Sequence, residues 1–250
     1  MAISKKNSSA HYKDRDGINH HSKELENIEK LSLICENAIK SENITNYLKS
    51  ELLNSQGLGK TNPNHNLCEG CDSERQTEKR ICRCMYYYNA SDKTKNCNNC
   101  KLKVRWRNVG KIKIEDYEVP MQSVVDSVGG IDLVINYNGE KYGVEVKPPN
   151  STETISRMVA ETLTYTSTYD SDLSLKPAIA VFKENDDGRE TYQYKIIKML
   201  DERYHNEWEK ITKLVNVFTI SVSEHGGIAD FKIEPFCKYR GHKCDYHSTA

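Results

Sequence analysis

The sequence predicts an α/β fold with a mixed sheet, in which a hairpin is followed by alternating helices and strands. Residues 129–149 contain two strand-like runs joined by a tight turn. Residues 177–182 form a short, nearly continuous apolar run, which is typical of a buried strand. Helical periodicity flanks this run on both sides, and a further strand is predicted at 215–222. The expected order from residue 130 is therefore strand, strand, helix, strand, helix, strand.

The chain of 250 residues is long enough for one sizeable core and a smaller module. We expect a disordered tail at 1–22, a helical region at 23–57, a cysteine-rich segment at 58–103, the core at 104–230 and a C-terminal tail at 231–250. No apolar run approaches the roughly 20 residues that a membrane helix needs, and the N-terminus lacks the apolar stretch of a secretory signal. A cytoplasmic protein is expected by default. The net charge of zero neither supports nor excludes a nucleic-acid partner.

The hairpin is predicted from the pair Asn138-Gly139, because a type I′ turn needs positive φ at both central positions. This turn fixes the register of the two strands. Tyr137 is then opposite Glu140, and Asp132 is opposite Glu145. Val134 and Leu133 are expected to face Gly143 and Val144 in the same register.

Alternation along the two strands separates an apolar face from a charged face. The apolar face is predicted to hold Ile131, Leu133, Ile135, Val144 and Val146. Asp132, Glu145 and Lys147 share the other face. Like charges on directly opposed strand positions are destabilising, so two opposed carboxylates need a compensating cation. A hard divalent metal with oxygen ligands meets that need.

The segment after the hairpin predicts a helix, because Pro148-Pro149 stops the strand and Ser151 or Thr152 can cap a helix that runs to about Tyr169. Its inner stripe is predicted as Ile155, Met158, Val159, Thr162 and Thr166, and a second stripe holds Arg157, Glu161 and Tyr165. Residues 183–190 are expected to form a loop, and residues 195–213 a further helix.

Six of the nine cysteines lie between Cys68 and Cys100, which in a reducing compartment favours metal binding over disulfides. Two CxxC pairs are a common way to give zinc four thiolates. We therefore predict that Cys68, Cys71, Cys97 and Cys100 bind Zn²⁺. A set that uses Cys82 and Cys84, a two-metal cluster, an iron–sulfur cluster and free surface thiols are the alternatives.

Residues 101–114 alternate basic and apolar side chains, which on a strand gives one basic face and one apolar face. Lys101, Lys103, Arg105 and Arg107 form the basic face. Contact with a nucleic-acid phosphate backbone and a merely solvated strand face explain this pattern about equally well.

The hairpin resembles the active-site signature of the PD-(D/E)XK nuclease superfamily, the restriction-endonuclease-like phosphodiesterases. The carrying residues are Gly130-Ile-Asp-Leu-Val-Ile135 and Gly143-Val-Glu-Val-Lys147. The resemblance covers about residues 112–222 and leaves out the cysteine-rich segment. It implies a restriction-endonuclease-like core in which Asp132, Glu145 and the backbone carbonyl of Val146 hold Mg²⁺ or Mn²⁺. Lys147 is then expected to position or deprotonate the attacking water and to stabilise the developing negative charge.

Members of the family often carry a further acidic residue upstream of the Asp. Glu118 is the candidate for that role, with Glu115 and Asp126 as alternatives. Some members also carry a Gln and, four residues later, a Tyr on the helix after the Lys. This chain has Glu161 and Tyr165 at that spacing, and the Glu-for-Gln departure leaves their roles unassigned.

The resemblance implies a Mg²⁺-dependent deoxyribonuclease, with an endonuclease of restriction or defence type as the leading hypothesis. An exonuclease or repair nuclease that acts on DNA ends or single strands is one alternative. A non-catalytic, zinc-dependent nucleic-acid-binding module is the other. DNA is the expected partner, and dimerisation of the chain would let two sites cut both strands. The sequence leaves the recognition site and the choice between DNA and RNA open.

Overall fold

The computed structural model describes residues 73–88, 100–120, 130–167, 175–203 and 205–236. The predicted tail at 1–22, the helical region at 23–57, and Cys68, Cys71 and Cys97 lie outside the described residues. Among the residues that are described, no helix is both long and apolar enough to cross a membrane.

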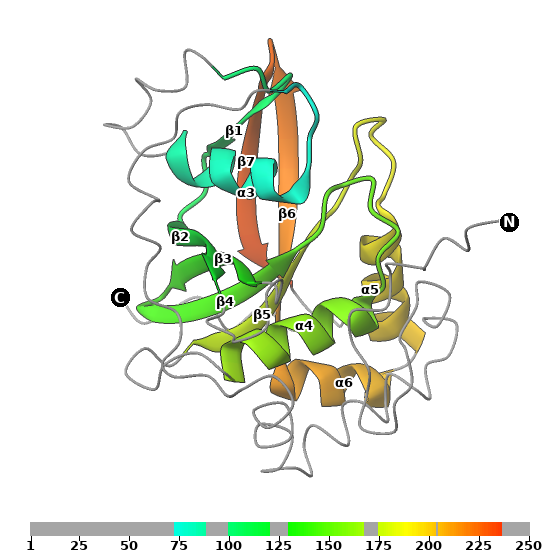
Figure 1. Cartoon of the computed structure of the whole chain (residues 1–250). Coiled ribbons are helices and arrows are strands. Elements are labelled where there is room, and N and C mark those ends of the chain that lie inside the picture. The colour runs from blue at the N-terminus through cyan, green and yellow to red at the C-terminus, as the bar shows by residue number, and fades with distance from the viewer. Residues whose placement is uncertain (1–72, 89–99, 121–129, 168–174, 204, 237–250) are drawn as a thin grey trace, which may run out of the picture.

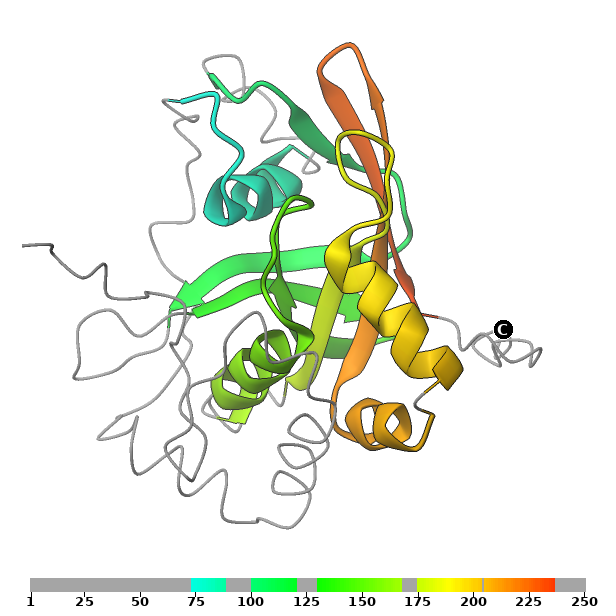
Figure 2. The same cartoon turned by 90° about the vertical axis from the view of Figure 1, so that its right-hand side faces the viewer.

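The core is a mixed, strongly curled sheet of seven strands that forms a half-barrel (Figures 1 and 2). The strands are β1 (Arg105–Asn108), β2 (Lys113–Pro120), β3 (Gly130–Tyr137), β4 (Glu140–Val146), β5 (Lys176–Phe182), β6 (Asn216–His225) and β7 (Ile228–Pro235). The helices described are α3 (Glu78–Tyr87), α4 (Ile155–Ser167), α5 (Tyr192–Arg203) and α6 (His205–Leu214). The predicted mixed sheet and α/β class are thus confirmed.

The strand order in the sheet is β1-β7-β6-β5-β4-β3-β2. Strands β2, β3 and β4 are antiparallel neighbours, whereas β4, β5 and β6 run parallel. Parallel neighbours need crossover connections. Helix α4 lies in the crossover from β4 to β5, and α5 with α6 lies in the crossover from β5 to β6. Strand β7 is antiparallel to β6, and β1 completes the far edge parallel to β7.

The hairpin of β3 and β4 has the predicted register. Asn138 and Gly139 have φ values of 53° and 82°, as a type I′ turn requires. Tyr137 pairs with Glu140, and the ladder continues to Leu133 opposite Val144. The paired positions end there, one step before Asp132 and Glu145.

The predicted apolar face of the hairpin is wrong at one residue. Leu133 and Ile135 pack in one large core, together with Val144 and Val146. Ile131 instead joins a small cluster with Val119, Val134 and Leu175. Side chains alternate strictly only where the backbone pairing is regular, and this pairing ends at Leu133 and Val144. Beyond it, the backbone N–H of Val146 donates to the carboxylate of Asp132, so the alternation rule no longer places Ile131.

Both faces of the sheet are covered around β5, which is why residues 178–182 of this strand are all apolar and buried. Ala178, Ala180 and Phe182 belong to the core that includes residues of α3, whereas Ile179 and Val181 belong to the core that includes residues of α4, α5 and α6. The alternation of β5 therefore divides its side chains between two apolar cores.

Helix α3 belongs to the cysteine-rich segment, which the sequence does not connect to the core. Ile81 and Met85 lie one turn apart and are fully buried against the sheet. Glu78 lies in the first turn, where a negative charge suits the helix dipole. The domain boundary predicted at 103 therefore divides a shared core.

The other elements predicted within the described residues differ from the structure in their bounds or in their number. Helix α4 begins at Ile155, because Thr154 rather than Ser151 or Thr152 is its cap: its Oγ1 accepts a bond from the Arg157 N–H at 3.2 Å. The helix predicted at 195–213 is two helices, α5 and α6. Strand β7 extends to Pro235, five residues past the predicted core boundary at 230. Residues 101–114 form no single strand, since β1 and the start of β2 lie at opposite edges of the sheet.

Gly143 is required by the close approach of α4 to β4. A Cβ atom at this position would lie 2.6 Å from Cγ2 of Thr166 and 3.3 Å from Cδ1 of Ile131. We expect Gly143→Ala to lower the free energy of unfolding by about 1–3 kcal/mol, as overpacking usually does. Urea denaturation measures the effect. Adding Thr166→Ser removes the clashing methyl and keeps the hydroxyl, so the double variant should recover most of the loss; equal stability of wild type and Gly143→Ala would contradict the packing.

Candidate active site

The site lies at the carboxyl end of β4, where Glu145 is placed between two core residues. Val144 and Val146 point into the core beneath α3, so the side chain of Glu145 points to the opposite face. It is nevertheless buried, with 3 % of its surface exposed. A carboxylate held at that depth needs cationic or proton-donating partners.

Asp132 on β3 is tied to the same strand end by a backbone contact. Its Oδ2 accepts a hydrogen bond from the N–H of Val146 at 2.8 Å. The carboxylate thus replaces the next rung of the ladder between β3 and β4. This contact fixes Asp132 beside Glu145, although the two are not a backbone pair.

Glu78 brings a third carboxylate to the two hairpin acids. One oxygen each of Glu78, Asp132 and Glu145 lies within 4.8 Å of the other two. Sequence reasoning missed Glu78. The apolar spacing of Ile81 and Met85 could have indicated a helix, but no local signal shows that this helix packs over the hairpin.

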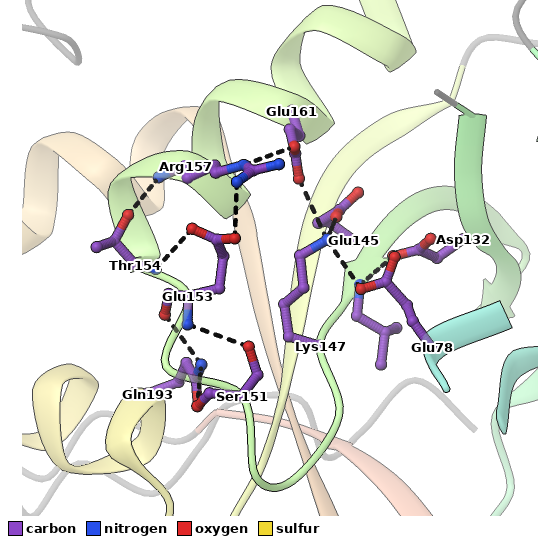
Figure 3. Close-up of polar contacts among 11 residues, drawn as sticks. Glu78, Asp132, Glu145, Lys147, Ser151, Glu153, Thr154, Arg157, Glu161 and Gln193 are labelled. Atoms are coloured by element: carbon purple, nitrogen blue, oxygen red, sulfur yellow. Dashed lines mark hydrogen bonds and ion pairs between the residues drawn. The ribbon is translucent and has the colours of Figure 1, made fainter. Parts of the chain in front are cut away.

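Lys147 lies among these carboxylates (Figure 3). Its Nζ makes a short contact with Glu145 Oε1, and it lies 3.1 Å from Glu78 Oε2 and 3.3 Å from Glu161 Oε2. The Lys147 side chain is 10 % exposed. The predicted proximity of Glu145 and Lys147 is therefore present, and α4 adds Glu161.

A buried guanidinium continues the network behind Glu161. Arg157 Nε donates to Glu161 Oε1 at 2.9 Å, and Arg157 Nη1 lies 2.8 Å from Glu153 Oε2. Gln193 of α5 anchors this region, because its Nε2 donates to the carbonyl oxygens of Ser151 and Glu153 at 3.0 and 2.9 Å. The side chains on both sides of Lys147 are thus held by several elements (Figure 3).

The negative charges of Glu78, Asp132 and Glu145 are only partly compensated by the positive charge of Lys147. Burial raises the pKa of Asp132 well above its usual range, and the charge of Glu78 raises it further against the effect of Lys147. Burial also raises the pKa of Glu145, followed by the charge of Asp132. A cation would relieve both effects.

The surroundings of Lys147 and Glu161 favour the ionised form of each group. Burial acts to lower the pKa of Lys147, but the carboxylates, led by Glu145 and Asp132, outweigh it and raise the pKa. Burial acts to raise the pKa of Glu161, but its bond with Glu145 and the charges of Lys147 and Arg157 lower it overall. Lys147 is therefore an ammonium ion in this setting.

The donor set fits a hard divalent cation. Three carboxylates from β3, β4 and α3 converge, and oxygen ligands are what Mg²⁺ and Mn²⁺ prefer. Within the described part of the chain, no other group of three metal-ligating side chains comes as close together. Glu78, Asp132 and Glu145 are thus the best candidate metal ligands.

Glu118 is not one of the three converging acids, although its neighbours Tyr117 and Val119 pair with Leu133 and Ile131 on either side of Asp132. It lies in β2 with a φ of 44°, and its Oε2 is 3.8 Å from Arg83 Nη2. Of the alternatives to it, Glu115 pairs with Lys141 at 2.8 Å, and Asp126 is outside the described residues. The upstream acid that joins Asp132 and Glu145 within 4.8 Å is Glu78.

The described cysteines do not gather into a metal site. Cys82 and Cys84 are buried in the core beneath α3, and Cys84 Sγ accepts the backbone N–H of Trp106 at 3.2 Å. Burial raises the pKa of Cys82 well above its usual range, and Asp132 adds to the effect. Cys100 is half-buried. Zinc binding by Cys68, Cys71, Cys97 and Cys100 stays a prediction.

The segment 101–107, predicted as a basic strand, buries its apolar side chains Leu102, Val104 and Trp106, although only residues 105–108 form a strand. On the other side, Arg107 donates two hydrogen bonds to Asp230, at 2.6 and 2.7 Å. Lys101 and Lys103 are exposed, and Arg105 is half-buried. Their contact with nucleic acid stays a prediction.

Comparisons with known proteins found no match: no family model, no curated protein and no solved structure matches this chain.

Proposed function

We propose that the chain is a metal-dependent nuclease with a restriction-endonuclease-like core. The observation that carries the proposal is the convergence of Glu78, Asp132 and Glu145 within 4.8 Å, with the ammonium of Lys147 beside them. A surface hairpin with incidental charges has no reason to bury two acids and a lysine at one strand end.

The choice of phosphodiester hydrolysis rests on the residue pattern of the hairpin. Asp132 on one strand and Glu145-Val146-Lys147 on the next resemble the PD-(D/E)XK signature. The parallel arrangement of β4, β5 and β6, with α4 after the lysine, is compatible with that assignment. DNA as substrate is supported by the same resemblance and by the basic side chains of residues 101–107.

The roles follow from the positions of the side chains. Glu78, Asp132 and Glu145 would hold Mg²⁺ together with the carbonyl of Val146. When bound, the metal ion supplies Lewis acidity and lowers the pKa of a water molecule. Lys147, which lies beside the proposed ligands, is suited to position or deprotonate that water and to stabilise negative charge that develops on the phosphate.

The proposal is tested with supercoiled plasmid, linear duplex, single-stranded DNA and RNA, each incubated with the full chain and Mg²⁺ or Mn²⁺. Cleavage is expected with either metal and should stop in excess chelator. Glu145→Ala serves as the inactive variant. Nicking of closed circles identifies an endonuclease, whereas degradation of linear DNA alone identifies an exonuclease. If wild type and Glu145→Ala leave every substrate intact under all metal conditions, the proposal is wrong.

A further inference from the structure

Arg157 of α4 contacts Lys147 only through Glu161. It is neither a proposed metal ligand nor the lysine proposed to act on the water and the phosphate. Its side chain is 8 % exposed, and it lies between Glu153, one turn before it, and Glu161, one turn after it. Glu161 uses its two oxygens for different partners: Oε1 accepts from Arg157, and Oε2 lies 3.3 Å from Lys147. A continuous path of charged groups therefore leads from Arg157 to Lys147 (Figure 3).

This polar stripe is not needed to attach α4 to the sheet. Ile155, Met158 and Val159 are completely buried on the same helix and pack against β5. Buried ion pairs can often be replaced by apolar residues at little cost to stability, because desolvation offsets most of their attraction. A buried arginine between two glutamates therefore indicates a role other than holding the helix.

The geometry shows what Arg157 can do. A lysine side chain is flexible, and its ammonium can rotate among several acceptors. A carboxylate that is itself fixed limits that freedom. Arg157 fixes Glu161, and Arg157 is in turn held by Glu153, whose backbone carbonyl is bound by Gln193 from α5.

We propose that Arg157 is a positioning residue that holds the ammonium of Lys147 beside Glu145 by fixing the carboxylate of Glu161. The catalytic consequence rests on the proposed nuclease function, whereas the effect on Lys147 itself does not. Without Arg157, Oε1 of Glu161 loses its hydrogen bond, and the carboxylate can rotate. Its Oε2 is then no longer held next to the ammonium of Lys147. Lys147 then moves among Glu78, Glu145 and Glu161.

The position of Lys147 is read by NMR of the full chain labelled with ¹⁵N-lysine, and Lys147→Met assigns its ammonium signal. A buried, ion-paired ammonium exchanges slowly with water, so the wild-type signal should be visible and separate. Arg157→Met should broaden it beyond detection. Arg157→Lys keeps the charge but not the two-sided guanidinium contact and should restore the signal in part. Lys198→Met on α5, which removes a contact with Glu190 in the loop before that helix, is the control and should leave the signal unchanged.

Single-turnover cleavage of the preferred DNA substrate at saturating Mg²⁺ gives the functional result. Arg157→Met should reduce the rate about 10- to 100-fold, as loss of a supporting contact does in other metal sites. The Mg²⁺ concentration for half-maximal rate should change less than about 3-fold, since the carboxylate ligands stay in place. Thermal unfolding of each variant identifies a general loss of folding.

The two readouts separate the possible failures. An unchanged Lys147 signal in a folded Arg157→Met variant overturns the positioning role. A lost signal with a wild-type cleavage rate overturns its catalytic importance. If the wild-type chain cleaves no substrate, the proposed function fails, and the ammonium signal alone decides whether Arg157 positions Lys147.

Discussion

Asp132→Asn is expected to abolish DNA cleavage and, at neutral pH without divalent metal, to stabilise the folded protein. Asparagine keeps the oxygen that accepts the Val146 N–H but removes a negative charge from a buried cluster of acids. Loss of a metal ligand should lower the cleavage rate by on the order of 10³-fold, which corresponds to about 4 kcal/mol of transition-state stabilisation. The gain in unfolding free energy should be on the order of 1 kcal/mol, the usual scale of a single substitution.

The gain in unfolding free energy of Asp132→Asn should increase with pH. The pKa of Asp132 is raised in the folded protein, by burial first and by Glu78 second. A raised carboxyl pKa contributes stability at low pH that is lost as the pH rises through the folded-state value. The advantage of Asp132→Asn over wild type should therefore be absent below about pH 4, near the pKa of an exposed aspartate, and grow toward neutral pH.

Urea denaturation between pH 4 and pH 8 and plasmid cleavage measure the two effects. Asp116→Asn is the matched control, because Asp116 is also buried and its Oδ1 accepts the N–H of Tyr117 at 2.8 Å, outside the acid cluster. The control should keep wild-type cleavage. Full activity of Asp132→Asn would remove this residue from the metal site, and a stability loss that grows with pH would contradict the charge excess.

Glu78→Gln should weaken Mg²⁺ or Mn²⁺ binding and cleavage strongly, because Glu78 supplies one of three converging carboxylates. We expect a reduction of about 10- to 100-fold in metal affinity. Glu118→Gln tests the alternative suggested by the sequence, in which Glu118 is the upstream ligand. Its carboxylate contacts Arg83 instead, so its metal affinity should stay within about 3-fold of wild type.

The comparison is made by titrating metal into each variant and by measuring the metal dependence of cleavage. Glu209→Gln, in an exposed pair with Lys213 on α6, controls for the loss of a surface carboxylate. A larger effect of Glu118→Gln than of Glu78→Gln would restore Glu118 as the third ligand and place Glu78 outside the metal site.

The hairpin could be predicted because its determinants are local. Asn138-Gly139 sets the turn, and the register from Tyr137 to Leu133 follows from it. Glu145 and Lys147 are two residues apart at the end of β4, so the alternation of an extended chain places them on one side. The failure at Ile131 is also local in origin, because the Asp132 side chain replaces a backbone rung that the alternation rule assumes.

The contributions of distant segments could not be predicted in this way. Glu78 reaches the hairpin because α3 packs over the sheet, and Arg157 acts through Glu161 because α4 crosses β4 closely at Gly143. Neither contact has a signature in a short window of sequence. Strand β7 is different, because Ala229, Phe231 and Ile233 alternate with Asp230, Lys232 and Glu234, and this local signal could have predicted it.

The most direct test of the central claim is a calorimetric titration of Mn²⁺ into the full chain and into Glu145→Gln. Mn²⁺ prefers oxygen ligands, so the cysteines are poor competitors for it. The wild-type chain should bind one Mn²⁺ ion through Glu78, Asp132 and Glu145, and Glu145→Gln should lose most of that affinity. Wild-type protein that binds no Mn²⁺, or that binds it equally well after Glu145→Gln, would contradict a metal site at the hairpin.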